Sequence, residues 1–191
     1  MSTTPPTITF HDDNRAPQLG MGVWQVPAEQ TADVVCSGIE AGYRLIDTAA
    51  IYGNEAEVGQ AIAESGVKRG ELFITTKIWT EHLAAGELVP SLQESLQRLG
   101  LERVDLTLIH WPSPNDKVDV PMEEYLPALA EAKAQGLTKA IGISNFTIAQ
   151  TRKAIEILGA DAIATNQIEI HPYLQNRLLV KFLQDNGIRV T

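Results

Sequence analysis

Side chains that can transfer protons stand near the ends of successive apolar runs in the sequence. Asp47 lies near the end of YRLIDTA, Lys77 near the end of LFITTKIW and His110 near the end of VDLTLIHW. Tyr52 follows Asp47 by five residues, in a segment that otherwise has the composition of a loop. An unpaired polar group in a protein interior costs about 1 to 3 kcal/mol, and a charged one costs more. We therefore expect the four residues to meet in one site, where they can pair.

These four residue types suit the reduction of a carbonyl group. If Asp47 pairs with Lys77, the lysine stays charged, and the following loop can fold Tyr52 over it. A positive charge about 4 Å from a phenol favours the ionised oxygen by at most about 4 kcal/mol at an effective dielectric of about 20. Tyr52 is then a general acid that works near neutral pH, and His110 supplies a second hydrogen bond to orient the carbonyl oxygen. Because no side chain donates a hydride, this reaction calls for a nicotinamide cofactor.

Further polar residues stand at the ends of two later runs. Ser144 and Asn145 come near the end of KAIGISNF, and Gln167 lies in IATNQIEI. Hydroxyl and amide groups of this kind can hold the carboxamide of a nicotinamide. A metal site is not expected, because there is no HExxH motif and no cluster of Cys and His. The four histidines are scattered over the chain: His11, His82, His110 and His171.

Short apolar runs alternate with segments of helical periodicity through most of the chain, which predicts repeated βα units in a single domain, residues 1–191. We expect strands at 18–24, 43–49, 72–79, 104–111, 139–146 and 163–170 and a further strand from 187. We expect helices near 28–41, 54–65, 84–99, 121–135, 147–158 and 175–186. Ahead of them, TITFHDDNRAPQ predicts a small hairpin turning at HDDN.

Strands that are apolar on both faces and alternate with helices form a parallel sheet, either open or closed into a barrel. The segment GMGVW lacks a third glycine at the dinucleotide-binding spacing and there is no P-loop, so we favour a TIM (β/α)8-type barrel. In such a barrel the C-terminal ends of the strands converge on one rim. We therefore predict that the strand order follows the sequence, that the helices lie outside, and that Asp47, Lys77 and His110 share one rim. Tyr52 should come within hydrogen-bond reach of Lys77.

The composition limits the classes of partner. The 191 residues are 44% hydrophobic and 20% charged, and the formal net charge is -9 with a pI near 4.9. An acidic chain is a poor sequence-independent ligand for nucleic acid or anionic lipid, so we expect a small-molecule partner. The start MSTTPPTITF has no signal-peptide pattern and no run of 18 apolar residues occurs, so we expect a cytoplasmic protein.

At these same motifs the sequence resembles the aldo-keto reductase family. GYRLIDTAAIYGNEAEVG is similar to the family's first signature, ITTKIW to its lysine strand, LTLIHWPSPND to its histidine strand, and IGISNF and TNQIEIHPYLQ to its nicotinamide-binding strands. The nearest likeness is to bacterial members that reduce 2,5-diketo-D-gluconate, methylglyoxal and similar small carbonyls. The resemblance implies NADPH as cofactor, with NADH left open.

The resemblance also implies a role for each matching residue. The catalytic tetrad would be Asp47, Tyr52, Lys77 and His110, with Tyr52 as the acid. Cofactor contacts would come from Val23, Trp24, Asp47, Ser144, Asn145 and Gln167. The substrate pocket would be lined by Trp24, Tyr52, Trp79, His110 and Trp111.

The family's barrel has eight strands and about 250 residues, whereas this sequence provides six to seven βα units. We therefore expect a barrel incomplete at the C-terminus, weak NADPH binding and self-association through open sheet edges, although family members are usually monomeric. Two alternatives to a reductase stay open. Lys77 could form a Schiff base as in a lyase, or the chain could be a non-catalytic fragment or binding subunit.

Overall fold

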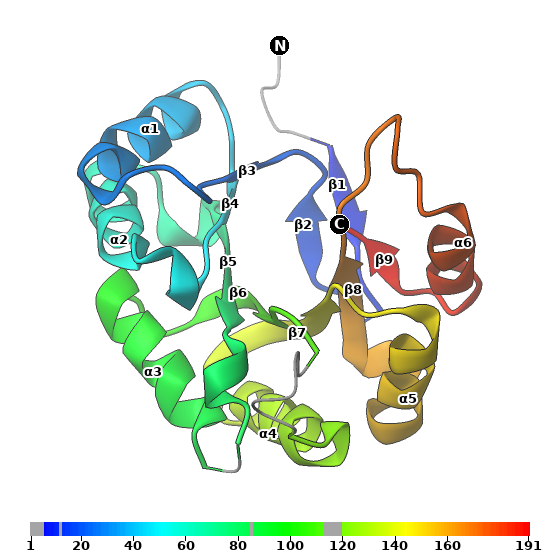
Figure 1. Ribbon diagram of the computed structural model, residues 1–191. Coiled ribbons are helices and arrows are strands. Elements are labelled where there is room, and N and C mark those ends of the chain that lie inside the picture. Colours follow the sequence, from blue (N-terminus) through cyan, green and yellow to red (C-terminus); the bar gives the residue numbers. More distant parts are fainter. Residues whose placement is uncertain (1–5, 12, 85, 113–119) are drawn as a thin grey trace.

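A curled parallel sheet forms the centre of the computed structural model, which describes residues 6–11, 13–84, 86–112 and 120–191 (Figure 1). Its strands pair in the order β3-β4-β5-β6-β7-β8-β9, so the order in the sheet is the order in the sequence, as predicted. The bounds are β3 Gly20–Gly22, β4 Leu45–Asp47, β5 Phe73–Ile78, β6 Val104–Ile109, β7 Thr138–Ser144, β8 Ile163–Gln167 and β9 Arg189–Val190. The architecture is therefore a seven-stranded part of a (β/α) barrel.

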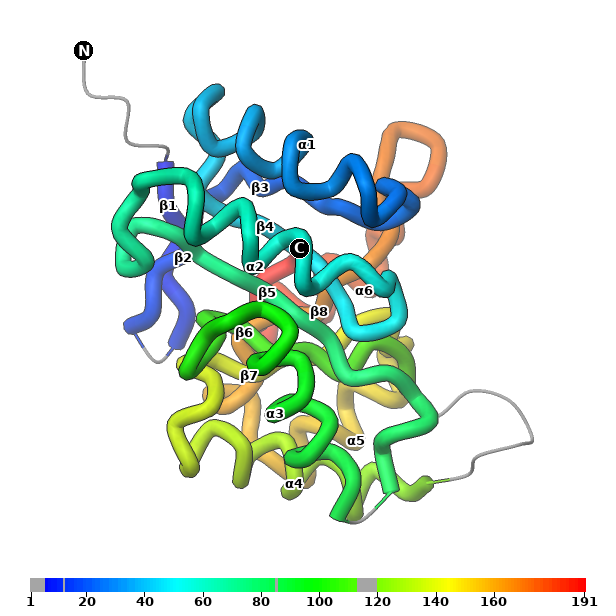
Figure 2. The backbone as a smooth tube through the Cα atoms, turned by 90° about the vertical axis from the view of Figure 1, so that its left-hand side faces the viewer, coloured from blue at the N-terminus to red at the C-terminus, as the bar shows by residue number. Residues whose placement is uncertain are grey.

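The α-helices lie on the outer, convex side of the sheet, where Figures 1 and 2 show them following one another around it. They are α1 Ala28–Glu40, α2 Glu55–Glu64, α3 Leu88–Leu99, α4 Met122–Ala134, α5 Ile148–Leu158 and α6 Arg177–Asp185. Four short 3-10 helices connect them to strands: η1 Ala50–Tyr52, η2 Arg69–Glu71, η3 Thr80–His82 and η4 Ala160–Ala162. No helix among the residues that the structure describes is long and apolar enough to cross a membrane.

The central strands β5 and β6 are buried on both faces because each face of the sheet packs against a separate apolar core. Every residue of β5 and of β6 is buried. The outer core lies between sheet and helices and includes Ile74, Ile109 and Leu92. The inner core fills the barrel interior and contains Phe10, Ala16, Phe73, Leu106, Leu108, Ala140 and Ala164. Runs such as LFITTKIW are therefore mostly apolar and do not alternate between apolar and polar residues.

An antiparallel hairpin, β1 Thr7–Thr9 and β2 Arg15–Pro17, precedes the barrel as the turn residues predicted. Phe10 lies in the connection between its strands and packs edge-on against Phe73, with ring centroids 6.2 Å apart. Ala16 of β2 belongs to the same inner core. The hairpin thus packs against the interior face of the sheet.

The predicted elements all occur, but several predicted boundaries are wrong by a few residues. The strand expected at 18–24 is regular only over Gly20–Gly22, and the helix expected near residue 84 begins at Leu88. Strands β6, β7 and β8 end before residues 110, 145 and 168, whereas they were predicted to continue to 111, 146 and 170. His110 and Asn145, which follow β6 and β7, therefore lie in loops at the rim. Side chains in a loop do not have to point alternately to the two faces of the sheet, as they do in a strand.

Candidate active site

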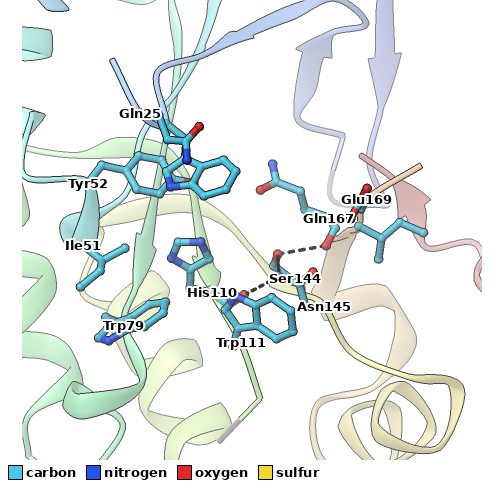
Figure 3. A pocket seen from close by; sticks show the side chains of 12 residues that line it. Gln25, Ile51, Tyr52, Trp79, His110, Trp111, Ser144, Asn145, Gln167 and Glu169 are labelled. Carbon is cyan, nitrogen blue, oxygen red and sulfur yellow. Dashed lines mark hydrogen bonds between the residues drawn. The ribbon is translucent and has the colours of Figure 1, made fainter. Parts of the chain in front are cut away.

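The polar residues predicted to meet do lie at the C-terminal rim of the sheet. Asp47 is the last residue of β4, Lys77 lies one residue before the end of β5, and His110 follows β6 directly. Later strands contribute Ser144, which ends β7, and Gln167, which ends β8. Because the strands are parallel, their C-terminal ends open onto the same cleft, which has a volume of about 680 Å³ (Figure 3).

Lys77 is fully buried beneath this cleft, and its Nζ contacts three oxygen atoms that accept hydrogen bonds. Its Nζ forms a salt bridge with Asp47 Oδ1 and donates hydrogen bonds to the Thr48 carbonyl, 2.8 Å away, and to the Tyr52 hydroxyl oxygen, 3.2 Å away. An ammonium has three N–H donors, and all three are used here.

Tyr52 reaches Lys77 because of the short turn that carries it. Residues Ala50–Tyr52 form η1, and Gly53 ends the turn with φ 69°, a left-handed conformation that glycine adopts without strain. The Lys77 Nζ lies 4.8 Å from the centroid of the Tyr52 ring. The phenol therefore sits over the lysine charge, which confirms the predicted contact and places its hydroxyl on the cleft wall.

His110 lies beside the phenol and is uncharged at neutral pH. Its ring centroid is 5.5 Å from that of Tyr52 and 5.2 Å from that of Trp79, both in edge-on geometry. Burial, and then the nearby charge of Lys77, lowers the pKa of His110 from 6.5 to about 4. Its Nδ1 is buried without a hydrogen-bond partner among the described residues, so Nε2 is the nitrogen available to a ligand in the cleft.

The opposite side of the cleft carries the amide and hydroxyl groups, as Figure 3 shows. Ser144 Oγ donates to the Gln167 carbonyl at 2.9 Å, and Asn145 Nδ2 donates to the His110 carbonyl at 3.0 Å. Gln167 Nε2 donates to Asp47 Oδ2 at 2.8 Å. The Asp47 carboxylate therefore binds Lys77 through one oxygen and Gln167 through the other, and links the two sides of the site.

Three indoles line the cleft, as the resemblance implied. Trp24 follows β3, Trp79 follows β5 and Trp111 follows His110. Trp24 is 68% exposed and Trp111 is 44% exposed, which is unusual for such large apolar side chains. Their exposed faces are available to a ligand, whereas Trp79 also packs against His110.

Val23, expected to contact a cofactor, lies beside the cleft, and its cofactor contact stays a prediction. Its side chain is fully buried in the outer core and does not line the cleft. Its backbone N–H donates to the Asp47 carbonyl at 3.1 Å.

Four residues that line the cleft were not predicted from the sequence: Gln25, Ile51, Ile168 and Glu169. Each lies in a loop that follows a strand of the sheet, a position that strand periodicity does not reach. Gln25 has φ 63°, which is uncommon for a residue other than glycine and aims its side chain from the loop after β3. Within the described ranges no group of three or more His, Cys, Asp and Glu side chains could hold a metal ion.

Comparison with known proteins identifies a family that agrees with the fold and with the residues at the C-terminal rim. A model described as the aldo/keto reductase family matches residues 16–191, and the chain belongs to this family. Among curated proteins it is 58% identical over 175 residues to methylglyoxal reductase DkgB of Escherichia coli O157:H7. That match covers 92% of this chain and 65% of the relative. The chain thus spans slightly less than two thirds of the length of this relative.

Solved structures of similar proteins have the same fold. A Bombyx mori aldo-keto reductase in complex with NADP is 38% identical, with a TM-score of 0.92, and the match covers 98% of this chain and 66% of that one. A putative 2,5-diketo-D-gluconic acid reductase B is 37% identical, with a TM-score of 0.89, over 98% of this chain and 65% of that one. The predicted likeness to this branch of the family is confirmed.

Proposed function

We propose that the protein reduces the carbonyl group of small aldehydes and ketones to an alcohol with NADPH, and that Tyr52 donates the proton. The observation that carries the proposal is the contact between a buried, salt-bridged lysine and a phenol at the cleft wall. Lys77 Nζ donates to the Tyr52 oxygen, so the phenol's own hydrogen is left to face the cleft. A carbonyl oxygen bound there would accept it.

The proton transfer leaves a phenolate, and Lys77 is placed to stabilise that charge. At 3.2 Å the ammonium lies within direct hydrogen-bond distance of the phenol oxygen. Asp47 keeps the lysine charged and fixes its position. In the overall reaction the carbonyl carbon gains a hydride and the carbonyl oxygen gains the Tyr52 proton, which solvent later replaces.

His110 orients the carbonyl in this scheme and does not supply the proton. Its pKa of about 4 means that the imidazole is neutral at pH 7 and carries a single N–H. A neutral donor at Nε2 can hydrogen-bond the carbonyl oxygen together with the Tyr52 hydroxyl, because the two rings are neighbours in T-shaped contact, with centroids 5.5 Å apart. The polarised carbonyl is then held in one orientation.

The cofactor side of the proposal rests on donor chemistry that fits a nicotinamide carboxamide. Ser144, Asn145 and Gln167 present a hydroxyl and two primary amides on the cleft wall facing Tyr52, and these groups can donate to a carboxamide oxygen and accept from its NH₂. When bound, the nicotinamide would supply the hydride that no side chain can provide. The complex of a Bombyx mori relative with NADP supports NADPH as the cofactor to test first.

Methylglyoxal and 2,5-diketo-D-gluconate are the substrates that the relatives' names suggest. The indoles of Trp24, Trp79 and Trp111 give the cleft apolar walls that suit a compact carbonyl compound. Because the chain spans 65% of the methylglyoxal reductase, the activity of the whole protein remains a proposal.

The test measures NADPH oxidation by the purified protein with methylglyoxal, followed by identification of the alcohol product. Borohydride treatment with pyruvate or dihydroxyacetone is the parallel experiment. Methylglyoxal-dependent NADPH oxidation supports the reductase. A covalent borohydride-trapped adduct on Lys77 without NADPH oxidation would refute it in favour of a Schiff-base enzyme.

A further inference from the structure

A buried asparagine ties together the two loops that carry the proton donor and one wall of the cleft. Asn54 is 1% exposed and does not line the cleft. Its Oδ1 accepts a hydrogen bond from Thr48 Oγ1 at 2.9 Å, and its Nδ2 donates to the carbonyls of Val23 at 3.0 Å and Val26 at 3.4 Å. All three partners belong to loops at the rim.

The first of these bonds closes the turn that holds Tyr52. Thr48 and Asn54 stand at its two ends, and their side chains bond directly across it. Within the turn, the Tyr52 N–H donates to the Ala49 carbonyl at 3.0 Å. Thr48 also gives its own carbonyl to Lys77 Nζ at 2.8 Å. One residue therefore contacts the lysine through its backbone and Asn54 through its hydroxyl.

The other two bonds hold the loop after β3. Trp24 and Gln25 lie between Val23 and Val26, whose carbonyls both face the Asn54 amide. These two intervening residues line the cleft. The loop also places Gln25 in a left-handed conformation, φ 63°, which persists only where surrounding contacts fix it.

We propose that Asn54 is a positioning residue of the active site, which sets the Tyr52 hydroxyl over Lys77 and at the same time fixes the loop that carries Trp24. The proposal rests on the proposed function in that it assigns Tyr52 as proton donor. Asn54 acts through Thr48 and the two loops, since its burial keeps it away from substrate.

The chemistry of the site explains why an amide is needed there. One hydroxyl hydrogen must be accepted and two carbonyl oxygens must receive donors, and a primary amide has both kinds of group. Aspartate at this position would turn an oxygen toward two carbonyls, and leucine would leave the Thr48 hydroxyl without its acceptor and remove one donor from each carbonyl. Either change removes the tie and risks the fold, so the test is better made at Thr48.

The experiment compares Thr48→Val, which deletes the hydroxyl at nearly constant shape, with Thr48→Ser, which keeps it. Thr138→Val is the matched control, because Thr138 is another buried threonine whose hydroxyl donates to a carbonyl, that of Ala140 at 2.8 Å, at the start of β7. With methylglyoxal and NADPH we expect Thr48→Val to lower kcat about 10- to 100-fold, as for a misplaced reacting group, with little change in the KM for NADPH. Thr48→Ser and Thr138→Val should keep kcat close to that of the wild type.

Hydrogen exchange followed by mass spectrometry gives a readout that does not depend on activity. In Thr48→Val, amide exchange should accelerate in peptides covering 48–54 and 22–27 and stay unchanged in β6 and β7. In Thr48→Ser it should match the wild type throughout.

Each outcome decides for or against the positioning role. Local acceleration at both loops with a fall in kcat, restored by serine, supports it. Unchanged exchange at the two loops, an equal rise in β7, or an unchanged kcat in Thr48→Val overturns it. If the wild type does not oxidise NADPH with methylglyoxal, the proposed function fails, and the exchange data still decide whether Asn54 holds the two loops.

Discussion

Replacing Tyr52 by phenylalanine separates proton donation from every other property of the site. The substitution removes one oxygen, whose described hydrogen bond comes from Lys77. Lys77 keeps its salt bridge to Asp47 and its bond to the Thr48 carbonyl, so two of its three acceptors remain. We expect the free energy of unfolding to fall by only about 1 kcal/mol, the value of one hydrogen bond.

The effect of Tyr52→Phe on catalysis should be far larger. General acid catalysis contributes about 10²- to 10⁴-fold, or about 3 to 5 kcal/mol of barrier. We expect kcat for methylglyoxal to fall by that factor, while NADPH affinity, measured by fluorescence titration, stays close to the wild-type value. Cofactor contacts are proposed for the opposite wall, at Ser144 and Gln167, which the substitution leaves intact.

The control for this variant is Tyr173→Phe. Tyr173 is 98% exposed and does not line the cleft, so the same loss of a hydroxyl there should leave kcat unchanged. If Tyr52→Phe keeps more than about a tenth of the wild-type kcat, a loss below about 1.4 kcal/mol, Tyr52 is not the acid.

Three further predictions concern charge and stability. Lys77→Met should leave Asp47 without its cation and lower the free energy of unfolding by about 3 kcal/mol in urea titrations; an unchanged midpoint would contradict the pairing. The folded-state pKa of His110 lies below its unfolded value of 6.5, so the unfolded chain binds the extra proton and stability is lost as pH falls from 6.5 to about 4. The loss is at most about 3 kcal/mol before screening by water, and His110→Gln should remove this part of the pH dependence. Asp105→Asn removes the charge of a buried carboxylate that binds Arg69 at 2.7 Å. The variant should therefore unfold at a lower urea midpoint, while kcat per folded molecule stays unchanged.

The sequence predicted which polar residues share the C-terminal rim, because their positions there follow from the order of the strands. Asp47, Lys77 and His110 each lie at the end of an apolar run, and parallel strands bring such ends to one edge whatever the loops do. The contact of Lys77 with Tyr52 was expected because a lysine charge favours a nearby phenol oxygen. The contacts of Gln167 with Asp47, 120 residues apart, needed the curl of the sheet and were not foreseen.

Loop residues could not be predicted in the same way. The positions of Gln25 and Ile51 depend on turn geometry, a left-handed residue in one case and a 3-10 turn in the other, and neither leaves a periodic pattern. Asn54 is equally hidden, because an asparagine beside a glycine predicts an exposed turn. In the structure it is buried, and only the three-dimensional closeness of Val23 and Thr48 explains why.

The division between strand ends and loops has a consequence for how this scaffold can diversify. Asp47, Lys77 and His110 sit on or beside β4, β5 and β6, and Tyr52 is held at Lys77 by a hydrogen bond, whereas the side chains of Trp24, Ile51 and Trp111 line the cleft from segments between strands and helices. Substitutions at these three exposed positions touch no ionisable partner of Lys77 and leave no cavity in the core. A combinatorial library confined to them would therefore vary the shape of the accepted carbonyl compound while each member keeps the same proton donor, so selection could explore substrate range at little risk to folding.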